Sequence, residues 1–128
     1  MNRIKIAIPT KEDKGLEDSV SDVFGKAQNF VIVEVENGSI IDVKVVKNPA
    51  ASYKHGSGPI AVKMLTDMKV DAVAGREFGL GVSTLLEQNK IEKTKVKTEI
   101  TVKEAVKRVL NIRAKSHSSK EIPSPSSF

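Results

Sequence analysis

The dipeptide Asn37-Gly38 constrains the fold of this chain more than any other feature of its sequence. It lies between two segments rich in valine and isoleucine, residues 30–36 and 40–47. Asparagine and glycine both tolerate the positive φ angles of the tight turn that joins antiparallel strands. We therefore expect an antiparallel hairpin over this part of the chain.

An alternating pattern before the hairpin predicts a first strand. Ile4, Ile6 and Ile8 recur at every second position, which is the period of a strand with one buried face. Pro9 is expected to end the strand, because proline has no N–H to donate to a sheet. The polar stretch that follows, residues 11–21, is expected to form a loop.

Helices and strands alternate after the hairpin. An apolar stripe with helical spacing predicts a helix that packs on the sheet. Its members are Ile60, Ala61, Met64, Leu65 and Met68. Residues 70–74 are nearly all apolar, as in a strand buried on both faces, and a second helix is expected at 82–88. Residues 93–98 predict a lysine-rich edge strand, and Thr101 and Glu104 form a capping box at the start of a last helix.

This order of elements predicts an α/β domain with a mixed sheet of about five strands. In such a sheet, the loops at the carboxyl ends of parallel strands gather at one edge. We therefore expect the loops that follow Pro9, surround His55 and follow Gly75 to converge.

The length and composition limit the number of domains and the kind of protein that this chain can form. Its 128 residues fit one domain, predicted over 1–112. Residues 113–128 are rich in serine, lysine and proline and are expected to form a disordered tail. Without a run of about 18 apolar residues or a signal-peptide pattern, we expect a cytoplasmic protein with no membrane partner. The absence of cysteine excludes disulfides and thiolate ligands.

The charge balance favours an anionic partner. The chain has 21 lysines and arginines against 16 acids, a net charge of +5. Surfaces that bind nucleic acid concentrate basic residues on one face, often together with aromatic side chains. Aromatic residues make up only 4% of this chain, so we expect a small anion rather than nucleic acid as the partner.

A group of lysines near the predicted edge strand leaves a second interpretation open. Its members are Lys90, Lys93, Lys95, Lys97 and Lys103. With the basic tail, they fit a module that binds a protein or a nucleic acid. The simpler interpretation is a solvated edge whose charge discourages pairing with other chains.

A glycine-rich loop that runs into a predicted helix is the best candidate binding site. Gly56 and Gly58 allow the backbone to approach a bound group, Ser57 is expected to cap the helix, and Pro59 suits its first turn. Exposed N–H groups at the start of a helix attract anions. With the imidazole of His55 beside them, they predict a site for an anionic or metal-containing ligand; the alternative is a structural loop and cap.

The sequence gives little support for catalysis. It contains no phosphate-binding Walker loop, no metalloprotease histidine pair and no serine with an assigned base and acid. A two-metal nuclease needs converging carboxylates, and Asp22, Asp42 and Asp71 have no evident reason to meet. We therefore expect a protein that is not an enzyme.

Several short motifs occur in order along residues 3–111. They are Ile6-Ala7-Ile8-Pro9, Phe24-Gly25-Lys26-Ala27, Asn48-Pro49-Ala50, His55-Gly56-Ser57-Gly58-Pro59, and Val70-Asp71-Ala72-Val73 leading to Gly75 and Gly79. At this spacing, the chain resembles the family of nitrogenase iron-molybdenum cofactor biosynthesis proteins. The resemblance implies a ribonuclease H-like fold with three layers, α/β/α.

The resemblance also implies a carrier of an iron-molybdenum or iron-sulfur cofactor or its precursor, with cofactor-biosynthesis proteins as partners. His55 would be the metal ligand, within a wider set of binding residues. That set is Phe24, Gly25, Lys26, His55, Gly56, Ser57, Gly58, Gly75, Arg76 and Gly79. After the central strand, the family often has two adjacent glycines followed by a Gly-Pro pair, whereas this chain has Gly75-Arg76-Glu77-Phe78-Gly79-Leu80, in which Arg76 and Glu77 could fill the space for a ligand. The family also often has histidine at the position of Val23. The sequence leaves the physiological ligand and the oligomeric state open.

Overall fold

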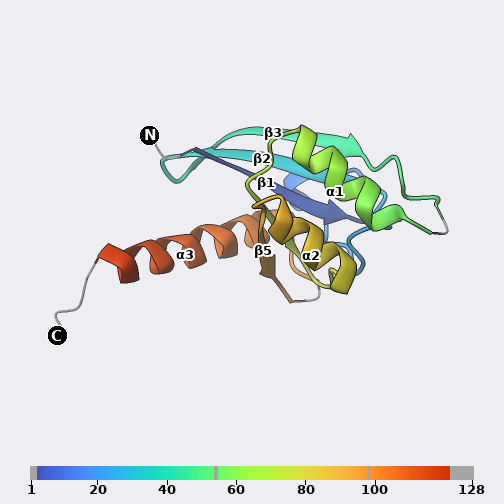
Figure 1. The fold of residues 1–128 in the computed structure, drawn as a ribbon. Helices are drawn as coiled ribbons and strands as arrows, with labels where there is room; N and C mark the ends of the chain where they lie inside the picture. The colour runs from blue at the N-terminus through green and yellow to red at the C-terminus, as the bar shows by residue number, and fades with distance from the viewer. Residues whose placement is uncertain (1–2, 54, 98, 122–128) are drawn as a thin grey trace.

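The computed structural model describes residues 3–53, 55–97 and 99–121, with 116–121 described by their backbone alone. The elements follow in the order β1 (Arg3–Thr10), η1 (Gly15–Glu17), β2 (Asn29–Glu36), β3 (Ser39–Lys47), α1 (Ser57–Asp67), β4 (Ala72–Gly75), α2 (Leu80–Gln88), β5 (Glu92–Lys95) and α3 (Val102–Glu121). The strands form one five-stranded sheet in the order β3-β2-β1-β4-β5 (Figure 1). The predicted α/β fold is confirmed.

The sheet is mixed, as the hairpin signal predicts. Strand β2 runs antiparallel to β1 and to β3, whereas β4 runs parallel to β1 and to β5. In the turn between β2 and β3, Asn37 has φ 52° and Gly38 has φ 85°, so both adopt the positive values expected of them. Four strands therefore point the same way, and their carboxyl ends lie at one edge of the sheet.

Each face of the sheet carries its own apolar core. Because successive strand residues point to opposite faces, Ile6 and Ile8 pack beneath α3, while Ala7 belongs to the core beneath α1 and α2. Figure 1 shows α3 on one side of the sheet and α1 and α2 on the other. The three-layer α/β/α arrangement is confirmed.

Strand β1 continues through Pro9 to Thr10, so the prediction that Pro9 ends the strand is wrong. Pro9 pairs with Phe30 of β2. The pairing of β1 with β4 is limited to Ile6 and Ala7, so no β4 residue is paired with Pro9. Proline is accommodated at a sheet position where the missing N–H has no ladder partner to lose.

Helix α3 begins as predicted and ends later than predicted. The N–H of Thr101 donates to Glu104 Oε1 at 2.9 Å, and the N–H of Glu104 donates to Thr101 Oγ1 at 3.2 Å, which is the capping box. The helix continues past Ile112 to Glu121, so a boundary at 112 is too early for the helix. Good helix formers follow Ile112, and Arg113 pairs with Glu92 of β5 at 2.7 Å.

The rest of the predicted tail, residues 122–128, lies outside the described residues. Among the helices that the structure describes, none has the length and apolar character needed to cross a membrane.

Candidate functional site

Loops from three parts of the chain meet at the edge where the parallel strands end, as the topology predicts. The N–H of Phe24 donates to the carbonyl of Glu77 at 3.2 Å, which joins the loop after β1 to the loop after β4. Lys26 Nζ donates to the carbonyl of Tyr53 at 3.1 Å, which joins the first loop to the one that carries His55. We call this edge, made of residues 21–28, 48–53, 55–58 and 75–81, the loop edge.

Asn48 holds two of these loops together. Its side-chain amide nitrogen donates to the carbonyls of Gly25 and Ala27, each at 2.9 Å, and its oxygen accepts the N–H of Ala50 at 3.1 Å. The side chain is buried, so these bonds replace hydration that the backbone groups cannot obtain. The sequence analysis placed Asn48 in a motif but did not predict that it joins two loops. The signal available in the sequence was a polar residue directly before Pro49 in a turn.

The glycines of the loop edge serve mainly to let parts of this chain touch one another. A Cβ on Gly25 would lie 3.0 Å from the Cα of Gly58 and 3.0 Å from Ser57 Oγ. A Cβ on Gly58 would lie 2.5 Å from a methyl of Val82, and one on Gly75 would lie 3.3 Å from the ring of Phe78. Gly58 is therefore needed for close packing of α1 against α2, and its approach to a ligand stays a prediction.

Helices α1 and α2 both begin at this edge without a side-chain cap. Their N-cap residues are Gly56 and Gly79, with φ angles of 76° and 81°, and at neither helix start does a backbone N–H donate to a side-chain cap. Ser57, predicted to be the cap, is instead the first residue of α1. It is buried next to Gly25, so its hydroxyl is not placed to cap the helix; Pro59 lies in the first turn, as expected.

These two helix starts pack against each other, because Gly58 and Val82 belong to the first turns of α1 and α2. Their free N–H groups give each start a partial positive charge. Helix α3 is different, since its first turn is closed by the capping box. The fold therefore leaves two adjacent helix starts open at the loop edge.

The hydroxyl of Ser57 adds a second unsatisfied group at this place. The residue is only 8% exposed, and no hydrogen bond joins its hydroxyl to any other residue that the structure describes. Buried polar groups in proteins are nearly always hydrogen-bonded, so such a group points to a partner outside the described residues.

The remaining predicted site residues lie in different surroundings. His55 and Lys26 are exposed. Arg76 is partly exposed and pairs with Asp22 at 3.5 Å, so much of its charge is already compensated. Phe24 is buried in the core, with its ring centroid 5.2 Å from that of Phe30. Phe24 supports the loop from beneath and has no surface with which to touch a ligand.

The loop edge also carries exposed apolar side chains that sequence reasoning missed. Val23 and Tyr53 are both 48% exposed, and Leu80, the first residue of α2, is 87% exposed. A leucine directly after Gly79, two positions before the predicted start of the second helix, was the signal for this feature. Their positions put apolar surface beside the open helix starts.

Within the described residues, no group of three or more histidines and carboxylates could hold a metal ion. His55 is thus a lone imidazole, and Zn²⁺ and similar ions require about four ligands. A bare metal ion has no closed site here. A preassembled cluster, whose own sulfur atoms complete the coordination of its metals, needs far fewer protein ligands.

Strand β5 carries one acid, Glu92, and two lysines, Lys93 and Lys95. Lys93 pairs with Glu87 at 3.8 Å, and the neighbouring Glu92 pairs with Arg113 of α3. The strand does lie at an edge of the sheet, as predicted. Its surface is mixed in charge rather than a basic stripe.

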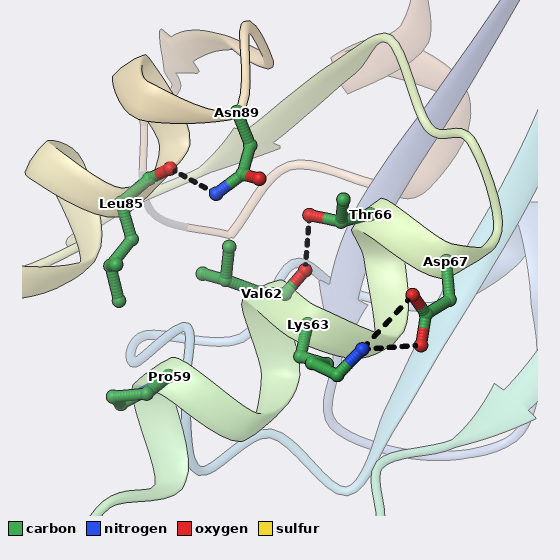
Figure 2. A pocket seen from close by; sticks show the side chains of 7 residues that line it. All are labelled: Pro59, Val62, Lys63, Thr66, Asp67, Leu85 and Asn89. Carbon is green, nitrogen blue, oxygen red and sulfur yellow. Dashed lines mark hydrogen bonds and ion pairs between the residues drawn. The ribbon is translucent and has the colours of Figure 1, made fainter.

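A shallow pocket of about 270 Å³ lies between α1 and α2 and extends along α1 from Pro59 to Asp67 (Figure 2). Its polar side chains bond within their own helices or helix ends: Lys63 with Asp67 at 3.3 Å, and Asn89 with the carbonyl of Leu85 at 2.8 Å. Thr66 likewise donates to the carbonyl of Val62 at 2.8 Å. The pocket offers none of the unsatisfied groups found at the loop edge.

Comparison with known proteins agrees with this architecture. The orange protein from Desulfovibrio gigas, solved in its apo form, has 28% identity and a TM-score of 0.73, with 84% of this chain and 87% of that chain covered. A Thermotoga protein of the DUF35 family has 29% identity and a TM-score of 0.69, with 84% and 88% covered.

An uncharacterized protein of Methanocaldococcus jannaschii is 30% identical over 95 residues, which are 74% of this chain and 76% of that protein. The family model described as dinitrogenase iron-molybdenum cofactor matches residues 2–112. The chain belongs to the dinitrogenase iron-molybdenum cofactor family.

Proposed function

We propose that this protein is a non-enzymatic carrier that binds an iron-molybdenum or iron-sulfur cofactor precursor, as an anionic cluster, at the loop edge. The observation that carries the proposal is the pair of uncapped helix starts, packed together beside the buried and unsatisfied hydroxyl of Ser57. Backbone N–H groups at helix starts are well suited to anions, and clusters of this kind carry negative charge.

Each part of the loop edge has a role in this proposal. The imidazole of His55 supplies one ligand to a metal at the surface of the cluster, and the N–H groups of the first turn of α1 donate to its sulfur atoms. Lys26 lies on a neighbouring loop and offsets negative charge. Tyr53 and Leu80 shield the cluster from water through their exposed apolar surface.

Among the described residues, His55 is the one histidine at the loop edge, and no group of three or more metal-binding side chains surrounds it. A single imidazole with backbone donors holds a cluster weakly enough to release it to another protein. The family description, which names the dinitrogenase iron-molybdenum cofactor, supports the same cargo. Proteins that assemble this cofactor in the cytoplasm are then the expected partners.

An anaerobic titration tests the proposal. Isolated iron-molybdenum cofactor, and in a parallel series a cluster assembled from ferrous iron and sulfide, is added to the protein and followed by visible absorption. His55→Ala should weaken binding by roughly tenfold or more, because it removes the one side-chain metal ligand. His117→Ala, at the only other histidine in the sequence, is the matched control and should bind like the parent.

Binding by the parent that His55→Ala leaves unchanged would show that the cluster sits elsewhere. No uptake of either cluster by the parent would refute the carrier.

A further inference from the structure

Strand β3 is an edge strand with an unusual surface. It is nine residues long and forms the outer margin of the sheet next to β2 (Figure 1). Four of its large apolar side chains are exposed to between 36% and 45%: Ile40, Ile41, Val43 and Val45. A long edge strand with exposed apolar side chains is a template for pairing with another chain.

The opposite edge of the same sheet is protected. Strand β5 is four residues long and carries exposed Lys93 and Lys95, the short length and charge by which proteins block edge pairing. Strand β3 carries the charged residues Asp42 and Lys44, and its pairing with β2 is irregular at Ile41, but it is nine residues long and exposes four large apolar side chains. This difference between the two edges is expected if another chain covers β3 and none covers β5.

The charges of β3 are not explained within one copy of the chain. Asp42 lies directly opposite Glu34 of β2, so an acid faces an acid. Neither Asp42 nor Lys44 makes an ion pair with any residue that the structure describes. Lys5 of β1 pairs with Glu34 at 3.6 Å and offsets that acid, but Asp42 has no such partner among the described residues. A positive charge from outside the chain is the natural complement of Asp42.

A second copy of β3 supplies that complement. In the central sequence Ile41-Asp42-Val43-Lys44-Val45, an apolar residue stands at each end, and charges of opposite sign stand on the two sides of Val43. In an antiparallel pair with a twofold axis at Val43, Asp42 faces Lys44 of the second copy, and Val45 faces the second copy's Ile41. An axis at Asp42 or at Lys44 would instead place identical charges opposite each other.

We propose that two copies of this protein pair through β3, antiparallel and with the twofold axis at Val43, so that the two sheets become one continuous sheet. The interface is isologous, as in most homodimers. On the α3 side of the sheet, apolar side chains from both copies meet across the axis, and on the other side the pairs of Asp42 with Lys44 close. The carboxyl ends of the two β3 strands point in opposite directions, so the two loop edges lie at opposite ends of the dimer.

Cross-linking tests the register, because the chain has no cysteine of its own. Directly opposite residues of antiparallel strands have Cα atoms about 4.5–5.5 Å apart, a separation that a disulfide spans. Val43→Cys should therefore form a covalent dimer under mild oxidation. Val45→Cys is the matched control, with 36% exposure against 37% for Val43. Its two copies would be separated by about 13 Å along the strands, so it should cross-link roughly tenfold more slowly or not at all.

Charge reversal tests the same interface without cysteine, by sedimentation velocity over a concentration series. Asp42→Lys and Lys44→Asp should each raise the dissociation constant of the dimer by roughly tenfold or more, since each places like charges opposite one another twice. The double variant reverses both partners and should restore the parent value. Circular dichroism checks that each variant is folded.

A parent that stays monomeric up to about 1 mM, the weak end of binding, would overturn the proposal. It would also be overturned if Val45→Cys cross-linked as readily as Val43→Cys, or if the double charge reversal failed to restore the dimer.

Discussion

Replacing Asn48 with alanine should loosen the loop edge and lower the stability of the whole domain. The substitution removes three hydrogen bonds, of 2.9, 2.9 and 3.1 Å, and leaves the carbonyls of Gly25 and Ala27 and the N–H of Ala50 without this partner. Each intramolecular hydrogen bond contributes about 0.5–1.5 kcal/mol, and a buried group left unsatisfied costs up to about 3 kcal/mol. We expect Asn48→Ala to lower the free energy of unfolding by about 2–4 kcal/mol.

Urea unfolding followed by circular dichroism measures this loss. With a denaturant slope of about 1–3 kcal/mol per molar, the unfolding midpoint should fall by about 1–2 M. Asn89→Ala is the control, because its exposed side chain makes a single bond, to the carbonyl of Leu85 at 2.8 Å. The control should lose less than about 1 kcal/mol. Equal losses in the two variants, or a loss below about 1 kcal/mol in Asn48→Ala, would refute the reasoning.

Four further substitutions test the helix packing, the helix cap and the aromatic core described above. Gly58→Ala should destabilise by about 1–3 kcal/mol, because its Cβ would lie 2.5 Å from Val82. Gly81→Ala, at the same second position of α2 and with no atom within 4 Å, should be neutral or slightly stabilising in thermal unfolding. Thr101→Ala should remove about 1 kcal/mol by opening the capping box, and an unchanged melting temperature would contradict the assigned cap. Phe24→Ala should cost about 3–5 kcal/mol in urea, since its ring packs against Phe30 and Phe78; a smaller loss would show that the loop edge does not depend on this core.

Local sequence patterns predict the fold well because the residues of each element favour the conformation that the element adopts. Asn37 and Gly38 have the positive φ angles that the hairpin needs, and the carboxylate of Glu104 reaches back to Thr101 as a capping box requires. The strands after the hairpin run parallel to the first strand, so the loops that follow them lie at one edge of the sheet. These features depend on neighbours in the sequence, so the sequence reveals them.

The details of the candidate site depend on contacts between distant residues, and there the predictions fail or stay silent. Ser57 precedes a helix as a cap would, but its hydroxyl is buried beside Gly25, more than thirty positions earlier in the chain. Gly58 has the spacing of a ligand-binding glycine, yet its lack of a side chain is required by Val82. The length of α3 is a similar case, since Arg113 is held by Glu92 of β5.

The binding of a cluster at the open starts of α1 and α2 is the central claim, and backbone amide spectra test it most directly. Isolated iron-molybdenum cofactor is titrated anaerobically into protein labelled with nitrogen-15, and the amide resonances are followed. The account predicts that the amides of Gly56, Ser57 and Gly58 and those of the first turn of α2 shift or broaden first, while those of α3 and β3 do not. Changes that centre on β5 or α3, or none at all, would contradict it.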